Sequence, residues 1–187
     1  MALTDEPWDR DRALRTASPR ELERYAASAP VVGDSFLRAR LMLRDLVGEV
    51  TGTPAIITAT CPDCGGCHGQ PTAQAAFVSV SRCALALVVA VNTDRAVGID
   101  VEPIVPPGDV AAVAARLDAV AALTGVRSIE HWTSVEAVLK ADGRGLRLDP
   151  RHVVVDGGIA TLGVVRYCVR AHPIDPQLLV TTAVALG

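Results

Sequence analysis

The stretch VGIDVEP at residues 97–103 has the pattern of a β-strand with two different faces. Its valines and isoleucine alternate with Asp100 and Glu102, and successive side chains of a strand point to opposite sides. The two carboxylates therefore share one face. Like charges side by side repel unless a cation or a basic group lies between them. The stretch predicts either a carboxylate pair that holds a cation or an acidic strand end that lies in solvent.

A second acidic position follows in HWTSVEAVLKADGRGL, residues 131–146. Glu136 and Lys140 lie four residues apart in the favourable acid-first order, and Trp132 lies one turn before them on the same helix face. Such a pair is either an ordinary surface ion pair of small energetic value or part of a site. The chain has seventeen arginines and a single lysine, which draws attention to Lys140.

A third carboxylate placed beside the first two would make an all-oxygen site. Mg²⁺ prefers such oxygen ligands and is usually held by carboxylates together with phosphate oxygens and water. A neighbouring lysine would neutralise the charge that develops when a pyrophosphate is cut. Asp100, Glu102, Glu136 and Lys140 therefore suit phosphate chemistry if the fold brings them together.

The rest of the chain predicts an α+β fold. A capping box with proline, Ser18-Pro19-Arg20-Glu21, starts a helix that ends near residue 27. Further helices are expected over 35–50, capped by Asp34 or Ser35, and over 109–123 and 128–141. Strands are expected over 55–60, 77–81, 151–155, 159–170 and 177–186, and as a hairpin of 84–91 with 96–102 through a turn at 92–95. Because helices precede antiparallel strands in each half, we expect two similar subdomains, 1–103 and 104–187, separated by a break at 103–108 rich in proline.

Composition excludes several classes of protein. Half of the 187 residues are hydrophobic and 21% are charged, as in a globular protein that buries a full core. The net charge of −3 and the lack of a basic run argue against a nucleic-acid surface. The acidic start of the chain is unlike an export signal, and the apolar run at 83–91 is too short to cross a membrane. We expect a cytoplasmic protein that binds neither nucleic acid nor membranes.

The segment CPDCGGCHGQP, residues 61–71, could be a haem attachment site, a zinc site, a redox centre or a metal-free loop. Cys64 to His68 has the C-x-x-C-H spacing of covalent haem attachment, although attachment normally takes place outside the cytoplasm. A zinc site is the second interpretation, since thiolate and imidazole are good zinc ligands. The last is a metal-free loop shaped by its glycines and proline. The candidate zinc ligands are Cys61, Cys64, Cys67 and His68.

With these motifs in hand, the chain from about Ser18 to the end resembles a 4'-phosphopantetheinyl transferase of the larger, surfactin-synthetase-activating class. Residues 98–102 match that family's G-[IV]-D-[VI]-E motif. Residues 132–140 resemble its W-x-x-K-E-A-x-x-K motif, followed by G-x-G-L at 143–146. The strand 77–81 stands where the family has a strand that ends in Ser-His, and 61–71 resembles a cysteine- and glycine-containing loop of actinobacterial-type members.

The resemblance implies a reaction and a set of residues. Mg²⁺-dependent transfer would move the 4'-phosphopantetheine arm of coenzyme A to a serine of an acyl- or peptidyl-carrier protein, with release of 3',5'-adenosine bisphosphate. Asp100, Glu102 and Glu136 would hold Mg²⁺. Glu136 would also act on the serine proton, and Lys140 would stabilise charge on the phosphates. The implied coenzyme A contacts are Ser81, Arg82, His68, Gln70 and Arg40.

Three positions depart from the family pattern. Arg82 replaces a histidine, Gln70 replaces a basic residue, and Val135 replaces the first lysine of the tryptophan motif. Arginine can still grip phosphate, whereas valine cannot. Each charge-assisted contact contributes about 1.5–3 kcal/mol, so losing two weakens binding roughly a hundredfold or more unless Arg82 or another arginine compensates. A non-catalytic relative that binds a carrier domain or coenzyme A as an accessory protein is therefore the alternative.

Overall fold

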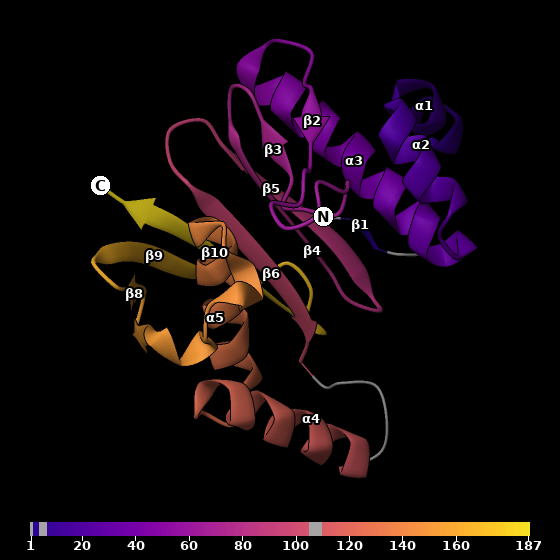
Figure 1. Cartoon of the computed structure of the whole chain (residues 1–187). Helices are drawn as coiled ribbons and strands as arrows, with labels where there is room; N and C mark the ends of the chain where they lie inside the picture. The colour runs from indigo at the N-terminus through magenta and orange to yellow at the C-terminus, as the bar shows by residue number, and fades with distance from the viewer. Residues whose placement is uncertain (1, 4–6, 105–109) are drawn as a thin grey trace.

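The computed structural model describes residues 2–3, 7–104 and 110–187 (Figure 1). The helices are α1 (Arg10–Thr16), α2 (Pro19–Ala26), α3 (Pro30–Thr51), α4 (Val110–Thr124) and α5 (Ile129–Asp142), with 3₁₀ turns η1 (Gly145–Arg147) and η2 (Pro150–His152). The strands are β1 (Ala2–Leu3), β2 (Ile57–Thr58), β3 (Thr72–Ala73), β4 (Phe77–Arg82), β5 (Ala86–Asn92), β6 (Val97–Pro103), β7 (Val153–Asp156), β8 (Ile159–Leu162), β9 (Val165–His172) and β10 (Leu178–Leu186). The expected α+β class is confirmed. Most of the proline-rich break, and the expected helix start at Asp109, lie outside the described residues.

Two antiparallel sheets meet in the middle of the molecule (Figure 1). β1, β5 and β4 lie side by side in the first sheet, and β6, β10, β9, β8 and β7 in the second, while β2 pairs with β3. Helices α1, α2 and α3 gather beside the first sheet, whereas α5 packs against β6 and β10 of the second. Strand β6, at the end of the expected subdomain 1–103, thus belongs to a sheet whose other strands all come from 153–186.

The expected hairpin of 84–91 with 96–102 is wrong. The turn between these strands does form, since Asn92 Oδ1 accepts hydrogen bonds from the N–H groups of Asp94 and Arg95, both at 2.9 Å. Beyond the turn, however, β6 pairs with β10, with Asp100 opposite Thr181, while β5 pairs with β4. A local turn signal fixes where the chain bends and not which strand lies next to it.

Helix ends follow the sequence signals at some positions and not at others. The capping box of Ser18 and Glu21 forms at the start of α2, and α5 begins at the Ser128 cap and ends before Gly143. Helix α3 begins five residues before the expected cap, at Pro30, because proline is well suited to the first helical turn. The expected strand 159–170 is broken into β8 and β9 at Gly163, whose φ of 61° needs a residue without Cβ.

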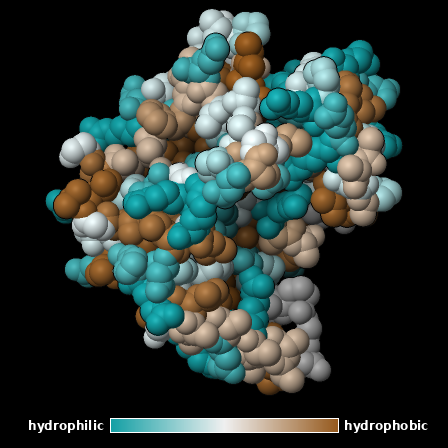
Figure 2. Space-filling view, viewed as in Figure 1, coloured by the Kyte–Doolittle hydropathy of each residue, from teal (hydrophilic) through white to brown (hydrophobic). Residues whose placement is uncertain are grey.

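The core beneath the second sheet consists of fully buried residues of α5 packed on β7 to β10. Helix α4 contributes little to it: Val120 and Thr124 are its buried residues in the described part of the chain. The rest of α4 is mostly alanine and valine, and this apolar surface is visible at the bottom of Figure 2. Among the described residues, no helix combines the length and the hydrophobicity that crossing a membrane requires.

Candidate functional site

The candidate site lies where β4 of the first sheet approaches β6 of the second. Ser79 and Ser81 point to the same side of β4, as period-2 alternation requires, and both are buried. Ser79 Oγ accepts a hydrogen bond of 3.1 Å from the N–H of Ile99 on β6. Polar side chains therefore connect the two strands. The charged residues of α5 lie against this polar region between β4 and β6.

Gly98 allows α5 to lie directly on β6. A Cβ atom at this position would lie 1.9 Å from the carbonyl oxygen of Ala137 and 2.6 Å from the backbone N of Ala141. Only glycine permits backbones to approach so closely. This close contact positions α5 so that Lys140 lies beside Asp100, which follows Gly98 by two residues on β6. The glycine of the family motif therefore has a local physical reason in this chain.

Lys140 is the centre of the cluster. Its Nζ donates hydrogen bonds to Asp100 Oδ1 at 2.7 Å, to Ser81 Oγ at 2.9 Å and to the carbonyl oxygen of Ile99 at 3.2 Å. The Ser81 hydroxyl donates in turn to Asp100 Oδ1 at 2.7 Å. Asp100 is 4% exposed, so its carboxylate depends on these partners for compensation. The single lysine of the chain thus links three separate sequence segments.

Glu136 lies on the same face of α5, with Oε2 3.8 Å from Lys140 Nζ. Burial raises the pKa of Glu136 above its ordinary value, the positive charge of Lys140 opposes this shift, and the charges of Asp100 and Glu102 add to it. An ionised carboxylate at this position is therefore more costly than in water. It is correspondingly ready to accept a proton or a cation.

Glu102 has a partner that the sequence did not reveal. Arg116 of α4 forms an ion pair with Glu102 Oε2 through Nη2, and the Trp132 side chain also hydrogen-bonds to this carboxylate. Burial nevertheless raises the pKa of Glu102, against the lowering effect of Arg116. A cavity of about 480 Å³ opens beside this pair and is lined by Arg82, Glu102 and Arg116 among others. Two arginine side chains and one carboxylate therefore line the same cavity.

The residues fit a divalent cation in one respect that the structure shows directly. Asp100 Oδ2 is buried and has no hydrogen-bond partner, whereas Oδ1 has two. A buried carboxylate oxygen of this kind is costly unless a cation satisfies it. In the described part of the chain, Asp100, Glu102 and Glu136 do not bring their oxygens within 4.8 Å of one another. Mg²⁺ commonly uses one or two carboxylates and completes its shell with water and phosphate, so the three carboxylates need not all bind the same ion.

The other expected coenzyme A contacts are divided among separate places. Arg82 is exposed at the end of β4, next to Ser81. Gln70 Nε2 donates to the backbone oxygen of Lys140 at 2.7 Å, so the side chain of Gln70 contacts the main chain of α5. His68 Nε2 lies 3.0 Å from Cys64 Sγ and belongs to the cysteine segment.

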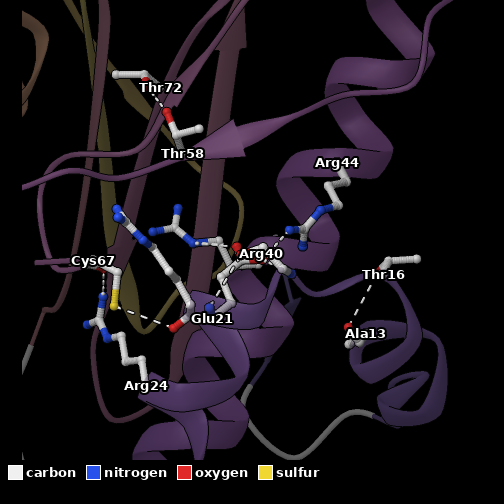
Figure 3. Close-up of polar contacts among 11 residues, drawn as sticks. Ala13, Thr16, Glu21, Arg24, Arg40, Arg44, Thr58, Cys67 and Thr72 are labelled. Atoms are coloured by element: carbon white, nitrogen blue, oxygen red, sulfur yellow. Dashed lines mark hydrogen bonds and ion pairs between the residues drawn. The ribbon is translucent and has the colours of Figure 1, made fainter.

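Arg40 lies in a different ionic cluster, shown in Figure 3. Its Nε is 3.3 Å from Glu21 Oε1, and Arg44 pairs with the other oxygen of the same carboxylate. Glu21 is 5% exposed and closes the capping box of α2, so this arginine pair anchors α2 to α3. A cavity of about 470 Å³ adjoins Arg40, with Cys67 also in its wall. In this structure the ion pair of Arg40 with Glu21 holds α2 against α3.

Val135, in place of the motif lysine, is completely buried in the core under the second sheet. Its side chain therefore faces away from the cluster, and packing suffices to explain a valine there.

Two residues of the site were not predicted from the sequence. Arg116 gave no signal within its alanine-rich helix, whereas Ser79 could have been recognised from the alternation in FVSVSR.

Comparison with known proteins gives no family for this chain. A scan against protein-family models found no match, and a search of curated proteins found no significantly similar sequence. The geometry of the site therefore carries the functional argument.

Proposed function

We propose that the chain is a 4'-phosphopantetheinyl transferase that modifies an acyl- or peptidyl-carrier protein. The observation that carries the proposal is the contact of Lys140 Nζ with both Asp100 and Ser81. These three residues come from the three segments on which the resemblance rests: the strand 77–82, the motif 98–102 and the motif 132–140. Contact among segments that are far apart in the sequence is the arrangement that a shared phosphate site requires.

Each residue of the cluster has a role in this proposal. Lys140 and Arg82 would bind the pyrophosphate of coenzyme A beside the cavity at Glu102. Asp100, with its unsatisfied Oδ2, would hold Mg²⁺ together with Glu102 and Glu136. Mg²⁺ bound there would neutralise charge on the pyrophosphate oxygens. Arg116 would exchange its present contact with Glu102 for a contact with phosphate.

Glu136 would act as the general base. Burial raises its pKa above the ordinary value, and a carboxylate with a raised pKa is a stronger general base. The serine hydroxyl of the carrier would transfer its proton to Glu136 while the serine oxygen forms a bond to the phosphorus that bears the pantetheine arm. The bond from that phosphorus to the bridging oxygen breaks, and 3',5'-adenosine bisphosphate leaves. Lys140 would stabilise the charge on the departing phosphate.

A second function, binding without transfer, is favoured by one specific feature. In this structure each carboxylate of the expected metal site already faces a basic side chain: Asp100 and Glu136 face Lys140, and Glu102 faces Arg116. Such internal pairing is what a relative that no longer needs the metal would retain. An accessory protein of this kind would bind a carrier domain or coenzyme A and leave both unchanged. We place either activity in the cytoplasm.

Release of 3',5'-adenosine bisphosphate tests the proposal. The protein, coenzyme A, Mg²⁺ and apo carrier proteins are incubated and the nucleotides are separated by chromatography. We expect release that requires the carrier and Mg²⁺, and that falls at least a hundredfold in Glu136→Gln. The matched control is Arg127→Met, which breaks an exposed ion pair with Asp118 away from the site and should leave the rate unchanged. Carrier binding without nucleotide release would support the accessory function instead.

A further inference from the structure

The cysteine segment contains a cluster of metal-binding side chains away from the carboxylates. The ligand atoms of Cys61, Cys64 and His68 all lie within 4.8 Å of one another, and no other group of three such side chains does so in the described part of the chain. Cys64 Sγ is 3.0 Å from His68 Nε2. All five cysteines are free thiols, so no disulfide uses these sulfurs. Two thiols and an imidazole are a ligand set suited to zinc.

The backbone of the segment is folded around the two sulfurs. The N–H of Gly66 donates to Cys64 Sγ at 3.4 Å, and Cys61 Sγ lies 3.9 Å from Asp63 Oδ2. Gly65, with φ of 71°, makes the turn that this requires. The turn is closed by the Gly65 N–H, which donates to the Cys61 oxygen at 2.9 Å, and by the Cys61 N–H, which donates to the Gly66 oxygen at 2.7 Å.

Only thiolates are metal ligands, so both cysteines would bind the ion in their deprotonated form. Cys61 is buried while Cys64 and His68 are exposed, so the group opens on one side to solvent. This open side leaves room for a water molecule as a fourth ligand.

Cys67, the fourth residue of the sequence-derived zinc set, has other partners. Its Sγ lies 3.6 Å from the carbonyl oxygen of Arg20. Its own carbonyl oxygen accepts a hydrogen bond of 2.8 Å from Arg24 Nη1, and Figure 3 shows these contacts tying the segment to α2. Cys67 thus attaches the segment to the helix and lies outside the cluster of three.

We propose that Cys61, Cys64 and His68 bind one Zn²⁺ ion, with a water molecule in the fourth position. The ion would clamp the connection between β2 and β3, and a clamped segment would also hold Gln70 against the backbone of α5 at Lys140. The proposal does not depend on the transferase reaction.

Cobalt spectroscopy on the full-length protein tests the proposal. The protein is stripped of metal, kept reduced without oxygen, and titrated with Co²⁺, which reports thiolate coordination through near-ultraviolet charge transfer and tetrahedral coordination through intense visible bands. We expect both features to saturate at one Co²⁺ per chain and to disappear when one equivalent of Zn²⁺ is added. Zn²⁺ should also raise the midpoint of thermal unfolding.

Variants assign the ligands. Removing an outer-shell partner already costs 10–100-fold in metal affinity, so Cys64→Ser and His68→Ala should each weaken Zn²⁺ binding by more than about a hundredfold. Both side chains are exposed, so neither substitution should prevent folding. Cys67→Ser is the matched control in the same segment and should bind normally. A folded wild-type protein without thiolate absorption would overturn the proposal, as would Cys64→Ser with unchanged bands. Loss of binding in Cys67→Ser would overturn the three-residue assignment.

Discussion

Replacing Lys140 by methionine tests whether the cluster is held together by the lysine. The substitution keeps the length of the side chain and removes its charge and donors. Asp100, which is 4% exposed, would then keep only the Ser81 hydroxyl as a partner for a buried negative charge. The cost in stability should therefore come almost entirely from the unpaired carboxylate.

The magnitude follows from burial. Removing one partner of a buried ion pair costs about 3–5 kcal/mol. The Lys140 side chain is 24% exposed, so solvent reaches the pair and the lower end, about 3 kcal/mol, is expected. For a chain of this length that corresponds to a fall of roughly 6–12 °C in the unfolding midpoint. Adding Asp100→Asn removes the stranded charge, so the double variant should recover about 2 kcal/mol of this loss.

Urea unfolding of the wild type, both single variants and the double variant measures this coupling. Arg127→Met is the control, because Arg127 Nε lies 2.8 Å from Asp118 Oδ1 in a pair of the same length that is exposed on both sides. We expect the control to lose no more than about 1 kcal/mol. Equal losses for the buried and the exposed pair, or strict additivity in the double variant, would refute the reasoning.

Three further predictions concern packing, pH and the second ionic cluster. Gly98→Ala should lower the free energy of unfolding in urea by about 1–3 kcal/mol and reduce nucleotide release, because the added Cβ would push α5 away from β6. Unchanged stability would contradict the close approach of the two backbones. Because burial raises the folded-state pKa of Glu136, the contribution of this group to wild-type stability should fall as pH rises above the unfolded value of about 4.3. Glu136→Gln should therefore gain stability relative to wild type as pH rises above this value, and a difference that does not vary with pH would count against this. Glu21→Ala should cost about 3–5 kcal/mol in thermal or urea unfolding, since it strands Arg40 and Arg44 in the interior, whereas a loss below 1 kcal/mol would show that solvent compensates them.

Several features of the site could be predicted from short-range patterns. The alternation in 97–103 placed Asp100 and Glu102 on one face of a strand, as β6 has them, because strand side chains have a period of two. The spacing of Glu136 and Lys140 correctly placed both on one face of a helix that begins at Ser128. These patterns depend only on local backbone geometry, which the sequence determines directly.

Contacts between segments that are far apart in the sequence were harder to predict. The partner of β6 is β10, about eighty residues further along the chain, and no turn signal near Asn92 could reveal it. The ion pair of Arg116 with Glu102 depends on how α4 is placed, and its sequence neighbours are mostly alanine. The arrangement of two similar subdomains stays a prediction. The break at Gly163, in contrast, had a usable signal, because glycine between two apolar runs commonly marks a turn.

Intact mass spectrometry of the carrier protein tests the proposed transfer most directly. Apo acyl- and peptidyl-carrier proteins are incubated with the protein, coenzyme A and Mg²⁺, and the modified residue is mapped by fragmentation. The proposed function predicts a gain of one phosphopantetheine group on a serine, absent without Mg²⁺ and in Glu136→Gln. No gain on several carriers, while an established transferase modifies the same carriers and this protein remains folded, would contradict it.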